Sequence, residues 1–138
     1  MTLAFDIDWP AVLVATVACM VLGGLYFGLA VPRQYPAVMG RQDQPAWKPP
    51  ASAFAGQGVA TLLVVLTSAV LLRTLDVREL GTGLLFGLVV GIGYLAAMVL
   101  NIAINPNFPH PFRYALLNGP YFLVCSLLVS AVIALMAG

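Results

Sequence analysis

Four long apolar runs alternate with short polar segments along the chain, and each run has the length of a membrane-spanning helix. The runs cover about residues 10–31, 51–72, 81–104 and 111–137. An α-helix rises about 1.5 Å per residue, so about 20 apolar residues cross the hydrocarbon core of a bilayer. The pattern therefore predicts an all-α, integral membrane four-helix bundle, in which residues 1–138 form a single membrane domain.

The segments between the runs carry the residues that mark helix ends. Trp9 and Pro10 stand where the first run begins, as an interfacial anchor and a first helical residue. Residues 32–50 contain five of the ten prolines, and a short amphipathic helix near residues 35–39 would lie on the membrane surface. Pro120 lies inside the fourth run, where its missing N–H predicts a kink.

Glycines recur at every fourth position of the third run, at Gly83, Gly87 and Gly91. At about 100° per residue they share one helix face, which Tyr94 and Asn101 continue. Small residues let helix backbones approach closely in a membrane, so we expect this face to pack against another helix of the bundle. The same stripe would also suit a homodimer, although packing within one chain is favoured. A second pair with this spacing lies in the first run, at Gly24 and Gly28.

The composition is that of a protein whose solvent is largely lipid. Hydrophobic residues make up 62% of the chain and charged residues 8%, whereas a soluble domain has about 25% charged residues. The formal net charge is +1 and the basic residues are scattered, so no nucleic-acid partner is indicated. The N-terminus lacks the basic region of a cleavable signal, which predicts an uncleaved first span. Expected partners are the lipid bilayer and either a second copy or another membrane protein.

Lysine and arginine are distributed unevenly between the two sides of the predicted bundle. The loops after the first and third runs (loops one and three) hold Arg33, Arg41, Lys48 and Arg113. The loop after the second run (loop two) and the termini hold Arg73 and Arg78. Cytoplasmic loops are enriched in these residues. The distribution predicts loops one and three in the cytoplasm and both termini outside.

No acidic or basic residue is predicted inside the hydrocarbon core. Proton-coupled transporters and ion pumps generally keep an ionisable group there, so the sequence disfavours these classes. It contains no catalytic, phosphate-binding or metal-binding motif. Cys19 and Cys125 each lie in an apolar run, as small buried hydrophobic residues do. We therefore expect no catalytic residue, no metal, no cofactor and no enzymatic activity.

Uncharged polar side chains gather at one depth. Counted from loops one and three, each run contributes one at comparable depth: Tyr26, Gln57, Asn101 and Asn118. Tyr94 and Tyr121 lie somewhat deeper, and the basic side chains of His110 and Arg113 lie at the rim. One interpretation is a structural polar layer, in which amides and phenols pair with each other or with helix backbone. The other is a cytoplasm-facing polar cavity.

Two short elements carry a resemblance to a known family: Gly-Gly-Leu-Tyr at residues 23–26 and Leu-Asn-Gly-Pro-Tyr at residues 117–121. The chain is similar over nearly its whole length to the DUF1761 family of small bacterial membrane proteins. Where that family usually has an aromatic pair followed by Ser-Pro, this chain has Tyr-Phe-Gly-Leu at residues 26–29. The resemblance implies a four-span protein of the bacterial inner membrane, without an established function.

Two functional hypotheses remain. The first is a non-enzymatic structural or partner-binding membrane component, whose helices pack through glycine stripes. The second is a binder or transporter of a small neutral or amphiphilic molecule, using the polar layer as the wall of a cavity. A cavity enclosed by the layer residues would favour the second hypothesis, and tight packing at that level would favour the first.

Overall fold

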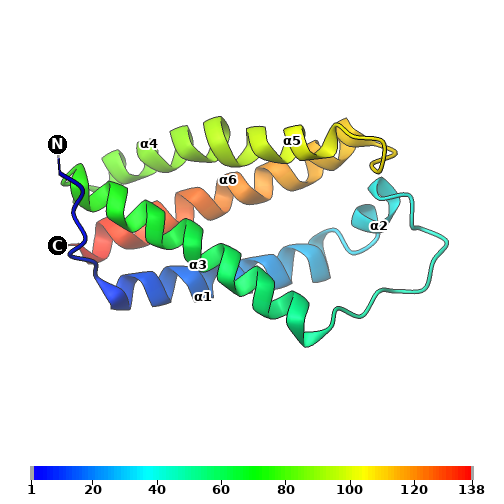
Figure 1. The fold of residues 1–138 in the computed structure, drawn as a ribbon, viewed down its shortest axis with the longest axis horizontal. Helices are drawn as coiled ribbons and strands as arrows, with labels where there is room; N and C mark the ends of the chain where they lie inside the picture. The colour runs from blue at the N-terminus through cyan, green and yellow to red at the C-terminus, as the bar shows by residue number, and fades with distance from the viewer. Residues whose placement is uncertain (1, 138) are drawn as a thin grey trace.

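The computed structural model describes residues 2–137 and shows four long apolar helical segments (Figure 1). These segments span Trp9–Ala30, Ala51–Thr74, Leu80–Ala103 and Pro111–Met136. Each is long and apolar enough to cross a membrane, and their ends lie within two residues of the ends predicted from the sequence. The prediction of an all-α membrane bundle of four helices is confirmed.

The first and third segments contain a wider helical turn in addition to α-helix. The first consists of α1 (Trp9–Leu25) followed by the π-helix η1 (Tyr26–Ala30). The third consists of α4 (Leu80–Val90), the π-helix η2 (Gly91–Ala96) and α5 (Ala97–Ala103). The second and fourth are single helices, α3 (Ala51–Thr74) and α6 (Pro111–Met136), and a short helix, α2 (Gln34–Val38), lies in loop one.

Helix α6 is the centre of the bundle. It packs against α1, against α3 and along the whole α4–η2–α5 segment, and it continues through Pro120. Helix α3 packs on α1 and α6, but makes few contacts with the α4–η2–α5 segment that follows it in the chain. Both termini and loop two lie at one end of the bundle, and loops one and three lie at the other (Figure 1).

The closest helix contact joins α4 and η2 to α6 through the glycine face. A Cβ atom built on Gly87 would lie 2.9 Å from the carbonyl oxygen of Ser126, and one on Gly83 would lie 3.1 Å from that of Ser130. At Gly91 it would lie 2.7 Å from a methyl group of Leu123. At Gly87 a side chain would meet the backbone of α6, whereas at Gly83 and Gly91 the nearest atoms belong to the side chains of Ala134 and Leu123. The two helices therefore approach closely along the whole glycine face.

The face that packs on α6 departs from the predicted one after Gly91. Tyr94 and Asn101 are exposed, and the buried series continues instead at Val99 and Ala103. A π-helix forms i→i+5 hydrogen bonds and so fits an additional residue into its turn. Because η2 has this geometry, the face is rotated relative to the extrapolation at 100° per residue. The prediction that both polar residues share the glycine face was wrong for this reason.

The predicted packing of Gly24 and Gly28 is also corrected by the structure. Both glycines are exposed, and no atom of another helix lies within 4 Å of a Cβ built on either. Gly23 is the glycine of this segment that faces the bundle, since its Cβ would lie 2.7 Å from the hydroxyl oxygen of Tyr121. The small residues Ala15, Cys19 and Gly23 follow one another at four-residue spacing toward α6, one position away from the predicted pair.

We expect Gly87→Leu to damage folding, because its side chain would have to displace the backbone of α6 at Ser126. The measurement is the yield of folded protein after purification in detergent and its midpoint of thermal unfolding. Gly24→Leu is the matched control and should leave both unchanged, since its side chain would enter open space. A Gly87→Leu variant with the yield and midpoint of the wild type would contradict the packing role.

Candidate functional site

Aromatic side chains fill the bundle at the end nearest loops one and three. The rings of Tyr26 and Tyr121 stack with centroids 5.6 Å apart, and Phe27 meets both rings edge-on. The cluster extends outward through Tyr35 of α2 to Tyr114 of α6. It joins η1, α2 and α6, so packing at this level is built mainly from rings, which favour such stacked and edge-to-face pairs.

Hydrogen bonds attach the polar atoms of this cluster to helix backbone. The hydroxyl of Tyr26 donates to the carbonyl of Leu117 at 2.7 Å, and that of Tyr121 donates to the carbonyl of Cys19 at 3.4 Å. Asn118 is 3% exposed, and its Nδ2 donates to the carbonyl of Tyr114 at 2.9 Å. Each side chain therefore satisfies backbone of its own or a neighbouring helix, as in a structural polar layer.

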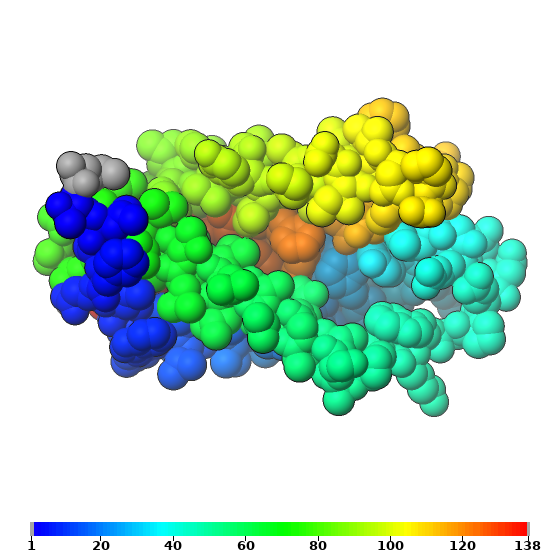
Figure 2. Space-filling model, viewed as in Figure 1, coloured from blue at the N-terminus to red at the C-terminus, as the bar shows by residue number. Residues whose placement is uncertain are grey.

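A groove open to the side of the bundle lies between α3 and η2, with α1 and α6 at its base. Figure 2 shows atoms of α6, in orange, between α3 in green and the yellow-green segment above it. The groove has a volume of about 90 Å³ and is lined by apolar residues, by the two buried cysteines and by Gln57, Thr61 and Tyr121. Its volume suits a few methylene groups, and it is far smaller than a pocket for a drug-sized ligand.

Four of the sequence-predicted site residues line neither this groove nor the aromatic cluster. The side chain of Tyr94 is 72% exposed, and Asn101 is exposed with only a 3.8 Å contact from its amide to the sulfur of Met98. His110 and Arg113 are exposed at the loop-three end. The structure thus brings Tyr26, Asn118 and Tyr121 together around α6, and leaves the predicted six-residue cavity unformed.

Comparison with known proteins places the chain in a family. Residues 10–134 match DUF1761, which is described as a protein of unknown function. The chain belongs to the DUF1761 family. No curated protein and no solved structure matches it. The match runs from Pro10 in the first apolar helix of this DUF1761 protein to Ala134 in the fourth.

The two elements that carried the DUF1761 resemblance meet in space. Residues 23–26 lie on α1 and η1, and residues 117–121 lie on α6 around Pro120. Pro120 has no N–H, so α6 lacks one hydrogen bond in this turn, and the Tyr26 hydroxyl binds a carbonyl beside the gap. Gly23 leaves the space that the Tyr121 hydroxyl occupies. Together they fix the aromatic end of α1 against α6.

The sequence reasoning missed two features of this DUF1761 protein. The aromatic cluster includes Phe27, Tyr35, Phe108, Tyr114 and Phe122, and the concentration of rings next to loops one and three was a signal for it. The second feature is a cavity at the opposite end, lined by the N-terminal segment, loop two and the ends of α3 and α6. Within residues 2–137, no three His, Cys, Asp or Glu side chains are grouped closely enough to hold a metal ion.

We expect Tyr26→Phe to lower the free energy of unfolding by about 0.6 kcal/mol, the average for a hydrogen bond within a membrane bundle. The ring stacking would remain, so the loss would report the bond to Leu117 alone. The measurement is unfolding of the detergent-solubilised protein in increasing sodium dodecyl sulfate. Tyr94→Phe is the control, because the exposed Tyr94 should show no change. Equal stability of both variants and the wild type would show that the bond contributes nothing.

Proposed function

We propose that this DUF1761 protein is a non-enzymatic membrane component that associates with a second copy of itself through the open groove between α3 and η2. The observation that carries the proposal is the position of Gln57. This residue is exposed on the groove wall, and within residues 2–137 its side-chain amide makes no hydrogen bond.

The depth of Gln57 makes its amide costly in lipid. It is six residues beyond Ala51, the first residue of α3, and so about 9 Å along the helix. An unpaired polar group in hydrocarbon raises the free energy of the membrane protein, and a partner that offers both donor and acceptor removes that cost. The amide therefore favours a partner with its own polar group at this depth.

A second copy is the partner with such a group at a matched position. Most homodimers have twofold symmetry, so the same surface patch occurs on both sides of the interface. The primary amide is self-complementary, because its oxygen accepts and its nitrogen donates. Small side chains also leave room for close approach on this part of α3, where Ala60 lines the groove and Gly56 has open space around it.

The distribution of ionisable groups supports a role without catalysis. In the apolar segments Arg73 lies one residue from the end of α3, and Arg113 lies two residues from the start of α6. The sequence places no other acidic, basic or histidine residue within the four segments. An acid–base pair at membrane depth is therefore not available to a bound substrate. The alternative of a polar substrate cavity loses its basis, because Tyr94 and Asn101 face outward.

We place the protein in the bacterial cytoplasmic membrane, with loops one and three in the cytoplasm and both termini outside. The support is the concentration of four basic residues in loops one and three, against two in loop two. In loop two, Asp76 and Glu79 accompany the positive charge, whereas loop one carries a single acid, Asp43.

We expect the wild-type protein to leave lipid nanodiscs partly as a dimer in native mass spectrometry. Gln57→Leu should weaken the dimer about threefold or more, because two amide contacts are lost. Val59→Leu is the matched control, since residue 59 lies about 160° around α3 from residue 57. A wild type that is monomeric at every protein concentration, or a Gln57→Leu variant that dimerises as tightly as the wild type, would refute this interface.

We expect a membrane-impermeant maleimide to distinguish the two sides in a bacterial host. Thr2→Cys should react in intact cells, and Gln44→Cys of loop one should react only after the cells are permeabilised. The wild type is the background control, because Cys19 and Cys125 are buried. The opposite labelling pattern would show that the orientation is inverted.

A further inference from the structure

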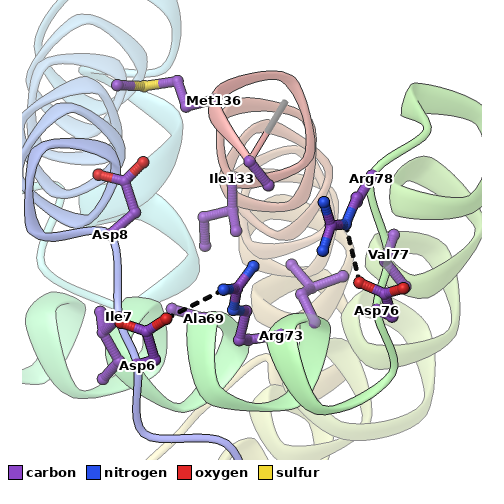
Figure 3. Close-up of a pocket in the computed structure, with 12 residues that line it drawn as sticks. Asp6, Ile7, Asp8, Ala69, Arg73, Asp76, Val77, Arg78, Ile133 and Met136 are labelled. Carbon is purple, nitrogen blue, oxygen red and sulfur yellow. Dashed lines mark hydrogen bonds and ion pairs between the residues drawn. The ribbon is translucent and has the colours of Figure 1, made fainter.

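A cavity with a charged rim and an apolar floor lies at the end of the bundle that holds both termini (Figure 3). Its volume is about 280 Å³. The floor consists of the buried side chains of Leu72, Val77 and Ile133. The rim carries two arginines and three aspartates, at Arg73, Arg78, Asp6, Asp8 and Asp76. It shares no lining residue with the groove and lies at the opposite end of the bundle from the aromatic cluster.

The end of α3 builds one wall of this cavity through a Schellman motif. The N–H of Val77 donates to the carbonyl of Leu72 at 3.0 Å, and that of Asp76 donates to the carbonyl of Arg73 at 3.1 Å. Asp76 takes the left-handed conformation at φ 50°, where glycine is usual. The motif turns the chain so that Arg73, in the last helical turn, and Arg78, just beyond it, both reach the cavity.

The N-terminal segment closes the opposite side. The N–H of Ala4 donates to Thr74 Oγ1 at 2.9 Å, which attaches the segment to the end of α3. Asp6 pairs with Arg73 at 3.0 Å. Asp8 caps α1 by accepting from the N–H of Ala11 at 3.1 Å. Three elements distant in sequence are therefore held around one space by specific contacts.

The two guanidinium groups retain donors for a ligand. Arg73 uses Nη2 for Asp6, and Arg78 uses Nε for Asp76 at 2.8 Å. A guanidinium has five N–H donors, so most of each group stays free. Figure 3 shows both groups directed toward the same space. Paired guanidinium groups match the oxygens of a phosphate, to which they form charge-assisted hydrogen bonds.

The carboxylates of the rim favour a ligand that carries a cationic group in addition to the phosphate. Three aspartates against two arginines give the rim a formal charge of −1, which opposes an anion and attracts a cation. A zwitterion that carries a phosphate and a primary ammonium is complementary to both sets of groups. The ammonium would lie toward Asp6 and Asp8, each of which keeps one carboxylate oxygen outside its bond to Arg73 or to the N–H of Ala11.

We propose that this cavity binds the phosphoethanolamine headgroup of a membrane lipid. The rim residues lie at the ends of membrane helices, at the depth where lipid headgroups reside. The apolar floor then receives the first carbons that follow the phosphate. Arg73 and Arg78 bind the phosphate, and the remaining carboxylate oxygens of Asp6 and Asp8 bind the ammonium.

The experiment compares retention of three lipids with identical acyl chains by the full-length protein in detergent, using native mass spectrometry. Phosphatidylethanolamine should be retained about five- to tenfold more tightly than phosphatidylcholine, whose quaternary ammonium has no N–H to donate. Phosphatidylglycerol should be retained more weakly than phosphatidylethanolamine, because it is anionic. Soluble glycerophosphoethanolamine is added separately, and it should not displace the bound lipid at equal concentration.

Three variants test which groups bind the headgroup. Arg78→Gln should weaken retention of all three lipids, because they share the phosphate that Arg78 binds, and Arg113→Gln, at the other end of the bundle, should leave retention unchanged. Asp76→Gly should also weaken retention, because Arg78 would lose the carboxylate that holds it. Glycine suits the left-handed conformation at residue 76, so this variant should fold at least as stably as the wild type.

Specific outcomes would overturn the proposal. Equal retention of phosphatidylethanolamine and phosphatidylcholine would remove the role of the ammonium, and a preference for phosphatidylglycerol would make the site an anion site. Displacement by equimolar glycerophosphoethanolamine would assign the cavity to a soluble phosphate ester instead of a lipid. Unchanged lipid retention in folded Arg78→Gln and Asp76→Gly proteins would place the lipid elsewhere.

Discussion

The bundle depends on one contact, the approach of the α4–η2 backbone to the backbone of α6. Lipid is as apolar as the helices themselves, so burial of apolar surface supplies little force between helices within the membrane. Dispersion contacts at short range must supply it, and they require small residues on both sides. Glycines on one helix and serines on the other meet this requirement. Helix α6 also packs against α1 and α3. The remaining helices pack around this pair.

The two ends of the bundle are stabilised by different chemistry. At the end near loops one and three, aromatic rings fill the space between η1, α2 and α6. At the end near the termini, a hydrogen-bonded N-terminal segment and the ion pairs of Arg73 and Arg78 take this role. Between these ends, α3 is held mainly from one side, by α1 and α6. The open groove follows directly from this arrangement.

The sequence predicted the helices closely, because hydrophobic length and proline positions depend on local chemistry alone. It predicted the contacts of Gly83, Gly87 and Gly91 for a similar reason, since three glycines within one α-helix share a face wherever the helix lies. It could not predict the position of Asn101, because the π-helical turn between Gly91 and Asn101 is set by packing against α6. The charged cavity was equally inaccessible, since it joins the N-terminal segment to residues about 70 positions away.

The π-helical turn η2 also limits how the helices wind around each other. Buried or half-buried residues recur every fourth position from Gly83 through Gly87, Gly91, Leu95 and Val99 to Ala103. In a regular α-helix a residue four positions further on lies about 40° further around the helix axis. Five such steps would rotate the buried face by about 200°. Repeats longer than 3.6 residues per turn impose a right-handed supercoil. The additional residue in η2 takes up about 100° of this drift, so the segment follows α6 with less winding than a regular α-helix would need.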